Sequence, residues 1–265
     1  MSKTYHRTLF IFRQDLRTSD NTGLIEAIQN STEVLPIFIH DTRAIDEFGI
    51  DDPRFGLIRE ALETIDRDLQ KVGGRLAIYQ GKTRDANIEK ICDDAHIDFQ
   101  SFQDFLLVEP HECEQRKVFT PYSMLWKKFL IAHPERLSIQ SFSGTEITWF
   151  VPNDRKKIGE VIRVPYHPLW TMEFGRSRLD RDVSHYDDLR NLPAVDGSTR
   201  LSPYIRFGIF SIREIYAKIE QNPTLLSEII WREFWYQIAI EFQERRRSIE
   251  WNTDDTSYEW QRFSE

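Results

Sequence analysis

The chain has 265 residues, of which 40% are hydrophobic and 13% aromatic, and its mean hydropathy is −0.52. These values are typical of a globular protein with one large or two smaller domains, and no apolar run predicts a membrane span. The start has no signal-peptide pattern, so we expect a cytoplasmic protein with no membrane partner. Cys92 and Cys113 fit neither a disulfide framework nor a zinc-binding spacing, so we expect neither a disulfide nor a zinc site.

The net charge of −8 argues against nucleic-acid binding over the whole surface. The charge is unevenly distributed, since residues 155–213 hold eleven Lys or Arg against seven Asp or Glu. This excess predicts either a local basic surface or a solvated, loop-rich segment, and the charge alone favours the second interpretation.

The first half of the chain alternates between two patterns. Short apolar runs at 8–13, 33–40 and 75–81 are typical of buried parallel strands, and 98–107 predicts another. Helices are expected between and after them. The clearest spans 55–72 with one apolar face and a stop at Gly73 and Gly74, and others are expected at 84–95 and from Pro121, with Thr120 as N-cap.

This alternation predicts a doubly wound, mostly parallel α/β sheet. The first strand is followed by neither a dinucleotide-binding glycine motif nor a phosphate loop. It continues into "FRQDLRTSDNTGL", where Asp20 or Ser19 can cap a helix that starts near Asn21. Arg13 and Arg17 can form ion pairs there with Asp15, as a ligand site or, as we favour, a structural cluster.

The periodic patterns end near residue 147, and a proline-rich stretch with scattered charges follows. Helices are expected again at 211–220, with Ser211 as cap, and at 225–242. The sequence therefore predicts an α/β domain over 1–146, a linker over 147–185 and a helical domain over 186–265.

One face of the last helix combines a carboxylate, two indoles and a guanidinium. Glu228, Trp231, Arg232 and Trp235 stand at i, i+3, i+4 and i+7. The indoles can be stacking platforms for nucleic-acid bases or ordinary core residues, and the helix alone favours neither interpretation.

The stretch "DGSTRLSPYIRFGIFS", residues 196–211, favours the first of these interpretations. Ser198, Thr199, Arg200 and Ser202 offer hydroxyls, successive amides and a cation, which suit a diphosphate. A phosphate cradle and an indole-rich helix are expected of an enzyme that holds an aromatic cofactor near a base.

Four motifs occur in order along nearly the whole chain. They are "FRQDLRTSDNTGL", "VFTPYSMLWKKF", "HYDDLRNLPAVDGSTRLSPYIRFGIFSIREIY" and "SEIIWREFWYQI". With them the chain resembles the DNA photolyase and cryptochrome family, and among its members the bacterial class I cyclobutane pyrimidine dimer photolyases resemble it most. The resemblance implies an antenna-type α/β domain followed by a helical FAD-binding domain.

The resemblance also implies roles for individual residues. The FAD contacts that it implies are Tyr186, Ser198, Thr199, Arg200, Leu201, Ser202 and Arg232. Arg190 corresponds to a DNA-contacting arginine, and Glu228 and Trp231 correspond to residues that meet a flipped thymine dimer. The implied activity is deoxyribodipyrimidine photo-lyase: light-driven, FAD-dependent repair of pyrimidine dimers in DNA by electron transfer.

Two departures from the family pattern bear on this activity. One β-α unit is missing after the helix near 88–95, which argues against an antenna chromophore. The chain also ends where the family's helical domain continues, so we expect an incomplete FAD site, completed by a second chain or by self-association. The alternatives are a cryptochrome-like photoreceptor without repair and a non-catalytic remnant that holds no FAD.

Overall fold

A computed structural model describes residues 3–81, 98–99, 106–114, 116–142, 147–153, 155–166 and 170–248. The chain divides into two compact units, and each is described by itself: residues 1–107 with 135–224, and residues 108–134 with 225–265. This division leaves the domain boundaries expected at 146 and 185 as predictions. In the described part of the chain, no helix is both long and apolar enough to cross a membrane.

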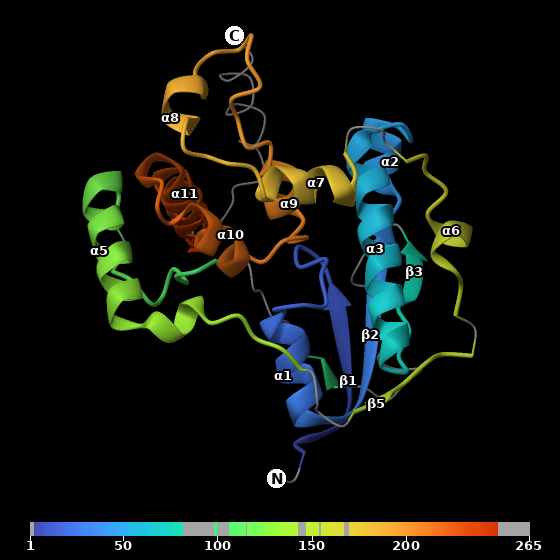
Figure 1. The fold of residues 1–265 in the computed structure, drawn as a ribbon. Helices are drawn as coiled ribbons and strands as arrows, with labels where there is room; N and C mark the ends of the chain where they lie inside the picture. The colour runs from blue at the N-terminus through green and yellow to red at the C-terminus, as the bar shows by residue number, and fades with distance from the viewer. Residues whose placement is uncertain are drawn as a thin grey trace. The chain divides into compact units, whose positions relative to one another are not determined.

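The first unit is built on a parallel sheet with strand order β3-β2-β1-β4, and β5 also pairs with β2 (Figure 1). The strands are β1 (Tyr5–Phe12), β2 (Ser31–Asp41), β3 (Ala77–Gly81), β4 (Asp98–Phe99) and β5 (Thr148–Trp149). Parallel pairing aligns Leu9 with Leu35 and Ile37 with Ala77, and these four residues are buried in one core cluster with Ile39. The prediction of a parallel α/β sheet followed by a helical region is confirmed.

Helices α1 (Thr22–Asn30) and α3 (Pro53–Lys71) follow the first two strands, and α2 (Arg43–Phe48) lies between them in the chain. The predicted helix at 55–72 is confirmed, because its apolar face is buried and Gly73, at φ +82°, follows its end. The helix expected at 84–95 and most of the strand expected at 98–107 lie outside the described residues, as does the site of the missing β-α unit.

The cap expected for the first helix was wrong. Asn21 caps α1, since its side chain accepts a hydrogen bond from the Leu24 amide at 3.0 Å. Asp20 instead has a left-handed backbone, with φ +48°, and its buried carboxylate accepts from the side chains of Ser211 and Arg213. A sequence pattern predicts that a helix is capped, but partners far along the chain, here Ser211 and Arg213, determine which of several polar residues is the cap.

The polar residues after β1 form hydrogen bonds within the fold, as a structural cluster would. The Arg13 amide donates to the Asp15 carboxylate at 2.7 Å, and the Arg17 guanidinium donates to the carbonyls of Asp20 and Gly208, at 2.9 and 3.0 Å. Arg17 therefore ties the end of the first strand to a segment almost 200 residues later.

The segment expected to be a linker contains regular structure and belongs to the first unit. Besides β5 it includes α6 (Ile158–Val161) and α7 (Met172–Leu179), which lie against α3. The Arg155 guanidinium binds both carboxylate oxygens of Asp66 at 2.8 Å and the Leu76 carbonyl at 2.7 Å. These partners are about 80 to 90 residues away, so no local periodicity could have predicted them.

Three short helices complete the first unit: α8 (Tyr186–Leu189), α9 (Ser202–Arg206) and α10 (Ile212–Ile219). Ser211 caps α10 as predicted, with its hydroxyl accepting from the Arg213 amide at 3.1 Å. A single-turn 3-10 helix, η1 (Pro134–Leu137), lies at the boundary between the two units in the chain.

The second unit pairs α5 (Phe119–Ala132) with α11 (Pro223–Ser248), whose first two residues belong to the first unit. The predicted start of α5 was wrong by two residues, because Val118 is its N-cap and Pro121 lies inside the first turn, where proline needs no amide partner. Trp126 and Phe234 are buried here, and the Trp126 indole donates to the buried Glu233 carboxylate at 2.6 Å.

Candidate functional site

The loop that connects α8 to α9, residues 190–201, contains most of the predicted cofactor contacts. Close packing fixes its backbone, because a Cβ atom on Gly197 would lie 2.3 Å from the Leu189 carbonyl oxygen. Arg200 has φ +54°, which a residue with a side chain adopts at a cost of about 1–3 kcal/mol. The neighbouring structure must therefore hold the loop in this conformation.

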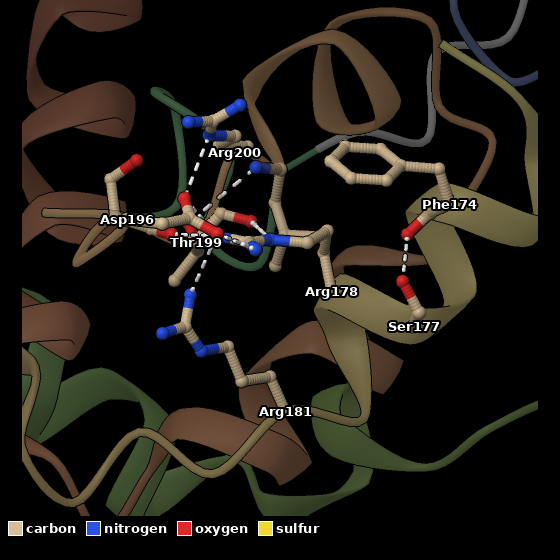
Figure 2. A network of polar contacts seen from close by, with 9 residues as sticks. Phe174, Ser177, Arg178, Arg181, Asp196, Thr199 and Arg200 are labelled. Carbon is tan, nitrogen blue, oxygen red and sulfur yellow. Dashed lines mark hydrogen bonds and ion pairs between the residues drawn. The ribbon is translucent and has the colours of Figure 1, made fainter. Parts of the chain in front are cut away.

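The Asp196 carboxylate lies at the centre of three guanidinium groups (Figure 2). Arg178 of α7 binds both of its oxygens, at 2.5 and 3.0 Å, Arg200 approaches to 3.0 Å and Arg181 to 3.5 Å. Its hydrogen bonds with Arg178, supported by the three positive charges, lower the pKa of Asp196 below its usual value. The carboxylate therefore stays ionised at neutral pH.

The sequence prediction missed Arg178. Its guanidinium is buried and also donates to two loop carbonyls, that of Ser198 and, at 3.2 Å, that of Thr199. The excess of basic residues in this segment was a weak signal, but it did not distinguish Arg178 from the other arginines around it.

The outer side of the loop offers hydrogen-bond donors. Ser198 and Ser202 are exposed and Thr199 is half-buried. Leu201 is buried, and its backbone is bonded within the protein, since its amide donates to the Thr199 hydroxyl at 3.5 Å and its carbonyl accepts from the Ile205 amide at 3.0 Å. Within the described residues, neither serine hydroxyl and neither amide of Thr199 and Arg200 makes a hydrogen bond.

These donors fit the diphosphate of a dinucleotide such as FAD. Three guanidinium charges against one carboxylate leave the cluster with a net charge of +2, and a diphosphate carries one negative charge on each phosphate group. Hydroxyls and backbone amides near a surplus of positive charge are the groups that bind phosphate in proteins.

Two further predicted residues lie on α8 and directly after it. The Arg190 guanidinium lies over the Tyr186 ring, 5.5 Å from its centroid, and both residues are half-buried. Tyr186, Arg190 and the 198–202 residues thus belong to the same unit, and Gly197 holds their segments in contact.

The other predicted residues, Glu228, Trp231 and Arg232, belong to the second unit. The Trp231 ring is stacked on Phe119 of α5, with centroids 3.6 Å apart and planes within 2°, so one indole face is covered. Trp235 lies 6.1 Å from it and is 58% exposed, while Glu228 is exposed and Arg232 lies 5.1 Å over Tyr236. Trp231 therefore has a packing partner within the protein, whereas Trp235 faces solvent, and a role of either indole in base stacking stays a prediction.

A buried carboxylate on the same helix was also missed. Glu233 is 1% exposed and accepts hydrogen bonds from the Trp126 indole and, at 3.2 Å, from the Val108 amide. Burial, together with the charge of Glu233, raises the pKa of Tyr122 far above its usual value. Among the described residues, no cluster of His, Cys, Asp and Glu could hold a metal ion.

Comparisons with known proteins agree with this architecture. The family model described as DNA photolyase matches residues 8–85. The deoxyribodipyrimidine photo-lyase of Alkalihalophilus pseudofirmus is 26% identical over 95% of this chain and 65% of its own length, and that of Synechococcus sp. is 24% identical over 88% and 60%. The crystal structure of the archaeal photolyase from Sulfolobus tokodaii superposes with a TM-score of 0.68 at 25% identity, covering 88% of this chain and 59% of that one.

The fold is thus a parallel α/β sheet followed by a helical region, as in photolyase structures. Over most of its length the chain is similar in sequence to photolyases, at 24–26% identity. It spans about three fifths of the length of the photolyases that it matches.

Proposed function

We propose that this protein is a photolyase-type flavoprotein that binds FAD and repairs pyrimidine dimers in DNA under light. The observation that carries the proposal is the loop around Asp196, where a net charge of +2 lies beside exposed hydroxyls and amides without hydrogen bonds. The relatives named above are photolyases, and the Sulfolobus tokodaii structure is described as holding two FAD molecules.

In this proposal the loop binds the FAD diphosphate. The hydroxyls of Ser198, Thr199 and Ser202 donate to phosphate oxygens, and the Arg200 guanidinium supplies charge. Leu201, Tyr186 and Arg232 are the remaining predicted contacts. When bound, reduced FAD supplies the electron that opens the dimer after excitation by light.

The lesion would meet α11. A dimer must leave the duplex to be reached, and an already poorly stacked lesion costs least to extrude. In this proposal Trp231 stacks against it, the exposed Glu228 accepts hydrogen bonds from its polar edge, and Arg190 contacts the DNA phosphates.

The first experiment is an absorption spectrum of the protein after it has been mixed with FAD and freed of the excess. We expect a retained flavin band, weakened by Ser198→Ala combined with Ser202→Ala. Ser184→Ala is the matched control, since that hydroxyl is already bonded to Asp182 at 2.9 Å. A protein that retains no flavin would contradict the proposal and favour the non-catalytic remnant.

A second candidate is a cryptochrome-like photoreceptor that binds FAD without repair. The stacking of Trp231 on Phe119 favours it, because an indole engaged within the protein is less available to a flipped base. Illumination of the flavin-bound protein with an oligonucleotide that contains one thymine dimer separates the two. Restored thymines support the photolyase, whereas unchanged dimers with intact flavin binding support the photoreceptor.

A further inference from the structure

The exposed donors of the 196–202 loop depend on an arginine behind it. Arg178 is 8% exposed and lies on α7, while the loop follows α8 (Figure 2). Its guanidinium makes four hydrogen bonds to the loop: two to the Asp196 carboxylate and one each to the carbonyls of Ser198 and Thr199. A planar guanidinium can bind several acceptors in one fixed arrangement, whereas an ammonium group acts as a point charge.

The two carbonyl bonds determine where the amides point. In a planar trans peptide, the C=O and the N–H point in opposite directions. The Ser198 carbonyl shares its peptide with the Thr199 amide, and the Thr199 carbonyl shares its peptide with the Arg200 amide. Because both carbonyls point toward Arg178, both amides must point away from it.

The amides of Thr199 and Arg200 make no hydrogen bond within the described residues. They are therefore available to an acceptor outside the loop.

We propose that Arg178 is a positioning residue that turns the amides of Thr199 and Arg200 outward to bind the phosphate oxygens of a dinucleotide. It does this without contacting the ligand. The inference rests on the proposed function in one respect, namely that the loop binds a diphosphate.

The test compares Arg178→Lys with Arg176→Lys. Both arginines lie on α7, but Arg176 is exposed, pairs with the half-buried Glu214 and, within the described part of the chain, forms no hydrogen bond or ion pair with the loop. Inorganic pyrophosphate and FAD are titrated into each protein, with the amide NMR signals of Thr199 and Arg200 as the site-specific measurement. Melting temperatures report whether each variant is folded.

We expect the two amide signals to shift with pyrophosphate in the natural protein and in Arg176→Lys. In Arg178→Lys the affinity falls roughly tenfold, as expected when a charge-assisted hydrogen bond is lost, and the two amides no longer respond. If Arg178→Lys is folded and binds as tightly as the natural protein, the inference is wrong while the proposed function stands. If the natural protein binds neither ligand, both are wrong.

Asp196→Asn decides the question if Arg178→Lys does not fold. This variant weakens the pair of Arg178 with residue 196 but keeps the hydrogen bonds from Arg178 to the carbonyls of Ser198 and Thr199. In the inference, these two bonds orient the amides. A retained response of the Thr199 and Arg200 amides supports the inference. A lost response in folded Asp196→Asn overturns it, because the carbonyl bonds would then be insufficient.

Discussion

At Gly208, two parts of the first unit that are far apart in the sequence lie in close contact. It has φ +60°, and a Cβ atom there would lie 1.9 Å from the Gln14 carbonyl oxygen. Its own carbonyl accepts a hydrogen bond from the buried Arg17. Any side chain at this position must therefore displace backbone as well as strain it.

We expect Gly208→Ala to lower the free energy of unfolding by about 3 kcal/mol or more, because strain and a backbone clash add. Gly73→Ala is the matched control, since Gly73 also has a positive φ, +82°, but no heavy atom lies within 4 Å of its Cβ position. The control should lose about 1 kcal/mol from strain alone. Urea unfolding followed by circular dichroism measures the free energy of unfolding of both variants. Equal losses in the two would show that the backbone clash contributes nothing.

His40 links the stability of the sheet to pH. It is 6% exposed on β2, and burial lowers its pKa below the ordinary 6.5, against a smaller opposing effect of Asp41. The folded state thus favours the neutral ring, so this contribution to stability is complete above pH 6.5 and is lost as the pH falls through the lowered value.

The expected result is a free energy of unfolding that decreases less in His40→Asn than in the natural protein between about pH 8 and about pH 5. The same substitution at the exposed His185 serves as the control and should leave the natural pH dependence in place. Parallel pH profiles for His40→Asn and the natural protein would show that the His40 imidazole contributes nothing to the pH dependence of stability.

At the scale of secondary structure, Asp20 connects the loop after β1 to the start of α10. Its carboxylate accepts from Ser211, from the Arg213 guanidinium at 2.7 Å and from the Gln140 amide at 2.8 Å. The side chains of Asp20 and Arg213 are only 3% and 6% exposed. Each of these charges depends on the other, because a buried charge without a partner is costly.

Removal of this carboxylate should release α10 from the loop. We expect Asp20→Ala to cost about 3–5 kcal/mol, because the buried Arg213 guanidinium loses the carboxylate that balances its charge. Asp52→Ala, which removes the cap of α3 and its more exposed pair with Arg54, should cost only about 1 kcal/mol. Chemical denaturation measures both, and Asp20→Ala combined with Arg213→Met should recover part of the loss. Equal costs for the two single variants would contradict this account.

At the scale of the whole molecule, local signals in the sequence predicted the elements but not their contacts. The 55–72 helix was predictable because its apolar spacing and Gly73 are adjacent in the chain, and the same holds for the Ser211 cap. The pair of Arg178 with Asp196 and that of Trp126 with Glu233 join residues 18 and 107 positions apart. Periodicity carries no information about such distant partners. The hydrogen-bond donors of the loop were therefore predicted, but Arg178, which holds the loop, was not.

The candidate site shows the same limit. The hydroxyls and Arg200 could be named because the residue types in 198–202 themselves suit a diphosphate. The covered face of Trp231 could not be predicted, because Phe119 lies 112 positions earlier and the helical pattern of 228–235 fits a stacking platform and a core residue equally well.

The second unit is formed from two segments far apart in the sequence, and its described core joins them through side chains. Phe119 stacks on Trp231 and meets the edge of Phe234, with centroids 6.0 Å apart. Gln237 donates to the Arg116 carbonyl at 2.8 Å, and Glu233 accepts from Trp126. Because these contacts lie within one unit, we expect α5 and α11 to open together as one cooperative element.

Phe119→Ala tests this expectation. Removal of the half-buried ring should lower the free energy of unfolding by roughly 2 kcal/mol, less than removal of a fully buried phenylalanine ring would. The contacts that are lost lie within the second unit. Hydrogen exchange should accelerate in peptides from α5 and α11 alike, while peptides from β1, β2 and α3 keep their protection. Met124→Ala, at a 64% exposed position of α5, controls for the change in helix composition. Acceleration confined to α5 would mean that the aromatic stack does not couple the two helices, and acceleration throughout β1 and β2 would mean that the whole chain opens as one unit.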